Sequence, residues 1–81
     1  LTGMHHLAPG IRNRLEHLYG LTRAEAEITI QLAQGDSLDA IAASRAVTLE
    51  TVRTQLRTVY RKTGTHRQGE LVFLVGVLGN G

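Results

Sequence analysis

Residues 48–63 read TLETVRTQLRTVYRKT and have the pattern of a two-faced helix. On a helix, its inward-facing residues recur at the spacing of one buried stripe: Val52, Leu56, Val59 and Thr63. The other side carries Glu50, Arg53, Thr54, Arg57 and Arg61. We therefore predict a helix that is anchored in a core on one side and presents guanidinium groups and a hydroxyl on the other. Such a helix is suited to reading the major groove of DNA.

The composition is typical of one small globular domain. The chain has 81 residues, which allow a single modest core, and its hydrophobic content of 42% argues against disorder. It has no cysteine, which excludes disulfides and thiolate metal sites and fits a cytoplasmic location. The longest apolar stretch, residues 71–78, is much shorter than the ~20 residues that cross a bilayer, so we expect no membrane partner.

The positive charge is concentrated in one segment. Between residues 48 and 68 there are five basic residues and one acid, a formal charge of +4, whereas the rest of the chain carries −2. A segment of this kind is typical of a protein that binds a polyanion.

Residues 11–20 are predicted to form a short leading helix. Its apolar residues Ile11, Leu15 and Leu18 are spaced as one buried stripe, and a glycine ends the segment. In the helix that follows, Ile30 points nearly opposite to the inner stripe and needs a cover. We expect the leading helix to pack across Ile30.

The next helices begin at side chains that cap a helix N-terminus. Thr22 and Glu25 are spaced as a capping box for the second helix. Ser37 caps a short helix over residues 38–45, and Thr48 caps the helix of the opening stretch. The connection of about three residues between these last two helices predicts a helix-turn-helix arrangement.

A last helix, beginning near residues 65–67, is apolar almost all round. A protein of this size cannot bury such a helix entirely within its own chain. We therefore expect part of this helix to contact a partner.

The chain divides into four parts: a linker or tag remnant (1–10), the leading helix (11–20), a helix-turn-helix domain (21–78) and a tail (79–81). The first part contains His5 and His6, which could also be interpreted as a metal site instead of part of a linker or tag. Adjacent residues on an extended chain point in opposite directions, however, and no other ligand is near. We therefore predict no metal site.

Residues 21–78 resemble the LuxR-type helix-turn-helix, the DNA-binding module of many bacterial transcription regulators. The matching motifs are Leu21-Thr22-x-x-Glu25-x-Glu27, Gly35-x-Ser37, Ile41-Ala42, Thr51-Val52-Arg53-x-x-Leu56, Tyr60-x-Lys62-x-Gly64 and Glu70-Leu71-Val72. The chain departs from the family at Ala46, where a turn glycine is common, at Arg45, where an apolar residue is usual, and at Ala24, where a basic residue is usual.

The resemblance implies an all-α fold of four helices after the leading helix, the third in the major groove and the fourth pairing two subunits. It assigns base contacts to Arg53, Thr54 and Arg57. It assigns phosphate contacts to Ser37, Thr48, Thr51, Tyr60 and Lys62, and a further one to Arg67 or Gln68. The implied dimer interface is Leu71, Val72, Leu74, Val75 and Leu78. The implied partners are double-stranded DNA, a second copy of the chain and RNA polymerase, with no cofactor.

The chemistry of the residues supports these roles. The fork of Arg53 or Arg57 matches guanine O6 and N7, and Thr54 suits a thymine methyl. Arg61 and Lys62 lie a turn or more past the helix end that enters the groove, so they suit phosphates. Glu50, in the first turn of this helix, either accepts a hydrogen bond from cytosine N4 or, as we prefer, only stabilises the helix N-terminus.

Two other functions remain open. A sigma-factor promoter-recognition domain also resembles the pattern Leu-Thr-x-x-Glu followed by a helix-turn-helix, and it needs no self-pairing last helix. A helical protein-interaction module would use the apolar last helix and leave the arginines solvated. No nucleophile–base pair, phosphate-binding glycine loop or metal spacing occurs, and His17 and His66 have no evident partner. We therefore do not expect an enzyme.

Overall fold

The computed structural model describes residues 10–80, in which all regular secondary structure is helical, with no strand. The helices are α1 (Ile11–Tyr19), α2 (Arg23–Ala33), α3 (Leu38–Arg45), α4 (Leu49–Thr63) and α5 (Gln68–Asn80). The predicted all-α class is therefore confirmed. His5 and His6 lie outside the described residues. None of the five helices is long and apolar enough to cross a membrane.

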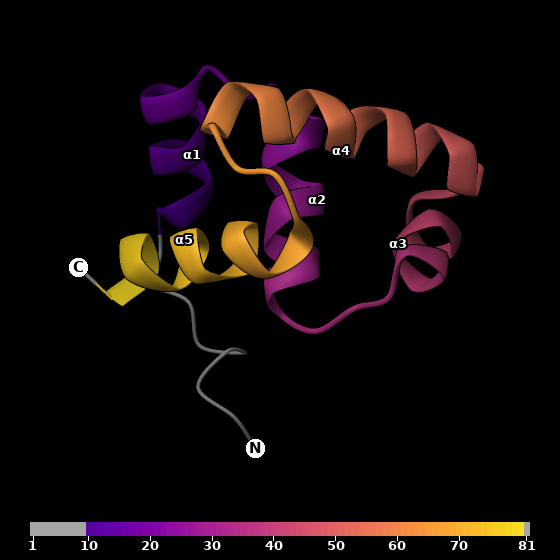
Figure 1. Cartoon of the computed structure of the whole chain (residues 1–81). Coiled ribbons are helices and arrows are strands. Elements are labelled where there is room, and N and C mark those ends of the chain that lie inside the picture. Colours follow the sequence, from indigo (N-terminus) through magenta and orange to yellow (C-terminus); the bar gives the residue numbers. More distant parts are fainter. Residues whose placement is uncertain (1–9, 81) are drawn as a thin grey trace.

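α2 is the central helix, and the other four helices all contact it (Figure 1). α4 runs across one end of α2 and α5 crosses it lower down, while α1 and α3 lie at opposite sides of the domain. α2 is therefore buried around most of its circumference, at Glu25, Ala26, Ile28, Thr29, Leu32 and Ala33. The buried hydroxyl of Thr29 donates to the carbonyl of Glu25 at 2.8 Å, so this polar group is satisfied within α2.

α1 packs against α2 and α5, but its buried stripe differs from the prediction. Ile11 and Leu15 are buried, whereas Leu18 is 61% exposed. The prediction for Leu18 was wrong because the buried face is centred on Leu15 and continues four residues later to Tyr19, which packs on the core.

Ile30 is half-buried and packs against the core. It lines a hollow of about 430 Å³ together with Glu27, Gln31, Ser44 and Arg45. All of these residues belong to α2 and α3. The predicted contact between α1 and α2 is present, but this open side of Ile30 is bordered by α3.

α5 begins at Gln68 and continues to Asn80, so the first two residues of the predicted tail extend this helix. Its start is held by Glu70, which accepts the backbone N–H of His66 at 2.7 Å. Near its end, Arg14 of α1 donates to the carbonyl of Leu78 at 2.6 Å. Such a contact satisfies a carbonyl of the last turn and places a cation at the negative end of the helix dipole.

The turn between α3 and α4 consists of Ala46, Val47 and Thr48. Ala46 has a φ of 56° and a ψ of 42°, and it is the one non-glycine residue with positive φ among residues 10–80. The N–H groups of Ala46 and Val47 bond back to carbonyls of α3 in a Schellman motif. Thr48 then caps α4. Ala46 therefore adopts a left-handed conformation in which its Cβ is strained.

We expect Ala46→Gly to raise the free energy of unfolding by about 1 kcal/mol, because glycine adopts positive φ without the steric cost that an L side chain bears. Urea denaturation measures the change. Ala43→Gly is the matched control, since Ala43 is exposed within α3, and it should lower stability by about 1 kcal/mol through the helix penalty of glycine. Equal losses in both variants would contradict the prediction.

Candidate nucleic-acid interface

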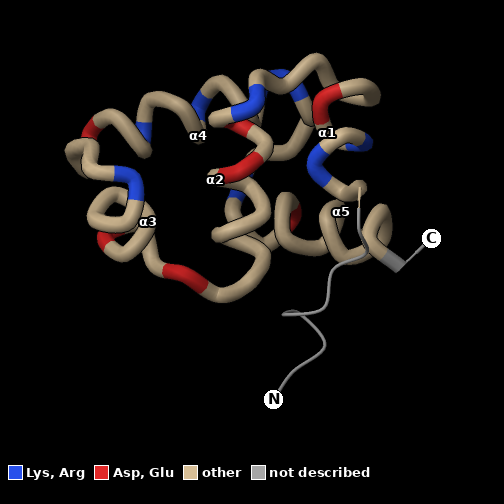
Figure 2. The backbone as a smooth tube through the Cα atoms, turned by 180° about the vertical axis from the view of Figure 1, so that it is seen from behind, with Lys and Arg blue, Asp and Glu red and all other residues tan. Residues whose placement is uncertain are grey.

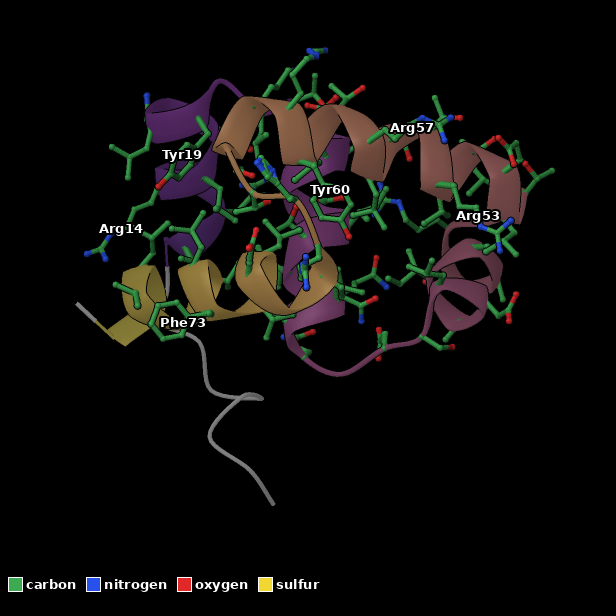
Figure 3. All side chains as sticks on the ribbon, viewed as in Figure 1. Arg14, Tyr19, Arg53, Arg57, Tyr60 and Phe73 are labelled. Atoms are coloured by element: carbon green, nitrogen blue, oxygen red, sulfur yellow. The ribbon has the colours of Figure 1, made fainter. Side chains whose placement is uncertain are left out.

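α4 separates an anchored face from an exposed one. Val52, Leu56 and Val59 are buried, as the sequence predicts. Figure 3 shows Arg57 on the upper side of α4 and Arg53 near the end of α4 that joins the turn to α3, and both side chains are exposed. The core contacts thus fix the rotation of α4 about its axis, and that rotation determines where the arginines point.

The three predicted base-contacting residues, Arg53, Thr54 and Arg57, are all exposed on α4. The Nη2 atom of Arg57 donates to Thr54 Oγ1 at 3.2 Å and lies 3.8 Å from Glu50 Oε2. Arg53 makes no ion pair or side-chain hydrogen bond within residues 10–80. The two arginines are one helical turn apart, so they project from the same side of α4. Arg57 is thus held by Thr54 and Glu50, whereas Arg53 has no such partner among the described residues.

The predicted hydroxyl contacts lie at exposed helix N-termini. Ser37 Oγ accepts the N–H of Ala40 at 3.1 Å at the start of α3. Thr48 Oγ1 accepts the N–H of Thr51 at 3.1 Å at the start of α4, and the two threonine hydroxyls lie 2.9 Å apart. A hydroxyl that accepts a bond from an amide still has its own proton to donate, and a helix N-terminus attracts anions. These groups are therefore chemically able to bind phosphate oxygens.

Lys62, also predicted to contact phosphate, forms bonds within the domain instead. Its Nζ donates to Glu25 Oε1 at 2.9 Å and to the carbonyl of Gly20 at 3.1 Å. Tyr60 is half-buried, and burial raises the pKa of its hydroxyl. Figure 3 shows its ring on the inner side of α4, toward α5. Both residues therefore help to hold α4 against the rest of the domain.

Glu25 is the buried acceptor of this arrangement. Burial alone would raise the pKa of its carboxyl. The hydrogen bonds from Lys62 and from the backbone of Thr22, together with the positive charge of Lys62, outweigh burial and lower the pKa below its ordinary value of 4.5. The carboxylate is therefore ionised, as both the capping box and the Lys62 contact require.

A second acid, Glu27, forms ion pairs with three arginines from three helices. Its carboxylate lies 3.1 Å from Arg45 of α3, 3.2 Å from Arg23 of α2 and 3.8 Å from Arg12 of α1. The hydrogen bonds from Arg23 and Arg45 lower the pKa of Glu27. Arg45 thus has an ionic partner on α2. Figure 2 shows that basic residues also lie along α4, and there Arg61 is exposed, as is Arg67 just before α5.

The predicted dimer interface on α5 needs correction. Leu71 and Val75 are fully buried in the core of the chain itself, so these two predictions were wrong. The other predicted residues, Val72, Leu74 and Leu78, are half-buried.

The strongly exposed apolar residues of α5 are ones that we did not predict. Phe73 is 73% exposed and Val77 is 53% exposed, and Figure 3 shows Phe73 at the outer edge of α5. A helix that is apolar all round has no periodicity from which to identify its outer face. Glu70 supplies the missing signal, because residues three and seven positions after it share its side of the helix.

Comparisons of the chain with models of known protein families, with curated proteins and with solved structures found no match. The functional interpretation therefore rests on the residues and their geometry.

Glu25→Gln should lower the free energy of unfolding by about 1 to 3 kcal/mol at neutral pH, because hydrogen bonds to a charged group are lost. The deficit should shrink as the pH falls below 4.5. In that range the unfolded chain binds a proton at Glu25 that the folded chain takes up only at lower pH, so acid removes this contribution. Urea denaturation at several pH values measures both effects.

Lys62→Met should reproduce most of this change, since it removes the same ion pair, whereas Glu16→Gln on α1 should have little effect. A pH-independent difference between the wild-type chain and Glu25→Gln would contradict the assigned role of the carboxylate.

Proposed function

We propose that the chain binds double-stranded DNA in a sequence-specific manner, as the output domain of a LuxR-type bacterial transcription regulator in the cytoplasm. The main support is the arrangement of α4, whose one face is locked into the core while Arg53, Thr54 and Arg57 are exposed together on the other. A helix held this rigidly can present arginine forks to guanine edges in the major groove.

In this proposal α4 is the recognition helix and α3 packs beside it across the three-residue turn. Base contacts come from Arg53, Thr54 and Arg57. Phosphate contacts come from Ser37, Thr48, Thr51, Arg61 and Arg67, with Tyr60 at the margin of the interface. Lys62 is left out, because its ammonium is bound to Glu25 and Gly20. Phosphate contacts of this kind fix the register on the duplex, whereas the base contacts select the sequence.

We propose that two copies pair through α5, at the face that carries Phe73 and Val77. A symmetric pair would present two copies of α4 to two half-sites of a palindromic duplex. RNA polymerase is a further proposed partner of a regulator of this class.

Two other functions compete with this proposal. The exposure of Phe73 also favours a protein-interaction module in which another protein covers α5 and the arginines are simply solvated. A sigma-factor promoter-recognition domain would bind DNA through the same helix but stay monomeric. Both alternatives are separated from the proposal by the two experiments below.

We expect Arg53→Ala and Arg57→Ala each to weaken binding to a duplex selected from a random pool by about 1 to 3 kcal/mol, the value of one arginine–guanine contact. Fluorescence anisotropy measures the loss. If Arg61 and Arg67 of each of two subunits neutralise one phosphate apiece, log affinity should fall with log salt at a slope near −4.

Arg23→Ala is the matched control, because it removes the same charge from the exposed surface of α2. It should leave affinity for the selected duplex nearly unchanged. Equal losses for all three variants, or failure of the wild-type chain to prefer any duplex, would refute specific recognition by α4.

We expect the wild-type chain to dimerise in sedimentation experiments at high concentration and Phe73→Glu to remain monomeric, since a carboxylate would have to be buried at the α5 interface. Leu18→Glu is the control, because Leu18 is a comparably exposed apolar residue on α1. A wild-type chain that is monomeric at every concentration, and on DNA, would favour the sigma-factor alternative.

A further inference from the structure

Glu50 is the one acid on the exposed face of the proposed recognition helix. It is also the only acid between residues 48 and 68. Its Oε2 lies 3.8 Å from Nη2 of Arg57, and the same Nη2 donates to Thr54 Oγ1 at 3.2 Å. Residues 50, 54 and 57 follow one row along the helix surface, because they are four and three positions apart. The carboxylate therefore lies within the group of side chains that would face the bases.

We propose that Glu50 is a specificity-determining residue, which disfavours duplexes of the wrong sequence more than the correct one. This inference rests on the proposed function and concerns the same surface. It differs from the expectation that Glu50 only stabilises the N-terminus of α4, because it assigns the carboxylate a role in the bound state.

Glu50 weakens binding to a duplex of the wrong sequence. Such binding depends almost entirely on cations that approach phosphates. A carboxylate in the contact surface is repelled by those phosphates, and its pairing with Arg57 offsets part of the positive charge that Arg57 would bring to one of them. Both effects weaken non-cognate binding.

On the correct sequence the same carboxylate has a use. Glutamate accepts a hydrogen bond from cytosine N4 in the major groove, and this contact offsets the repulsion. Arg57 can keep Thr54 on Nη2 while its other guanidinium nitrogens donate to guanine. The repulsion between the Glu50 carboxylate and the phosphates is thus offset by a hydrogen bond on a matching duplex, whereas on any other duplex it is not offset.

The two arginines differ accordingly. Arg53 has no partner of its own within the described residues, so it is available to any duplex, whereas Arg57 is held along the helix by Thr54 and Glu50. Arg57 is therefore the arginine whose contribution depends on Glu50.

The test compares Glu50→Gln with the wild-type chain on two duplexes at fixed salt: the best duplex selected from a random pool, and a shuffled duplex of the same composition. We expect the variant to bind the shuffled duplex about two- to fivefold more tightly, the size of effect that an exposed ion pair produces. Affinity for the selected duplex should rise less or fall, so the ratio of the two affinities decreases. Circular dichroism melting verifies that the variant is folded.

Glu16→Gln is the matched control, because Glu16 also lies 3.8 Å from an arginine of its own helix, Arg12, in a half-buried pair on α1. It changes the net charge equally but should preserve the affinity ratio. If Glu50→Gln also preserves the ratio while the wild-type chain discriminates between the duplexes, the inference is overturned and the proposed function stands. If the wild-type chain does not discriminate at all, the proposed function fails first.

Discussion

The position of α4, the proposed recognition helix, depends on one buried carboxylate, that of Glu25. Its Oε1 accepts a hydrogen bond from the backbone of Thr22 at the start of α2 and another from Lys62 near the end of α4. Lys62 in turn holds the carbonyl of Gly20, which ends α1. Three helix termini thus meet at one ion pair that is largely withdrawn from water. Removing either charge would leave the other partly buried and unpaired, which is more costly than losing a surface pair.

The remaining cations are divided between structure and the exposed surface of α4. Of the nine basic residues, four contact groups on other helices, namely Arg12, Arg14, Arg45 and Lys62, and a fifth, Arg23, pairs with Glu27 within α2. The other four, Arg53, Arg57, Arg61 and Arg67, all lie in the basic segment and none of them joins two helices. The net charge of +2 conceals this division, because six of the seven acids lie outside the basic segment. Electrostatic attraction for a polyanion would therefore be concentrated at α4.

Local chemistry made much of the fold predictable from the sequence. The caps at Thr22, Ser37 and Thr48 are observed where the residue types predict them, and so is the buried stripe of α4. The errors occurred where the pattern was ambiguous or contacts were distant in sequence. α5 is apolar almost all round and Glu70 alone marks its outer face, so Leu71 and Val75 were assigned to the interface and Phe73 was not. The Lys62–Glu25 pair joins residues 37 positions apart, and no local spacing predicts it.

The central position of α2 has a consequence for how two copies would measure distance along DNA. α4 and α5 each pack on α2 but share few direct contacts with each other. If α4 reads bases and α5 pairs subunits, as proposed, α2 sets the distance between the two copies of α4 and hence between two half-sites. α2 is a short helix of 11 residues. Two of its buried residues, Ala26 and Ala33, are small. If the proposal holds, evolution could retune operator spacing by changing side-chain volume inside α2, while every residue proposed to contact DNA or the second subunit stays the same.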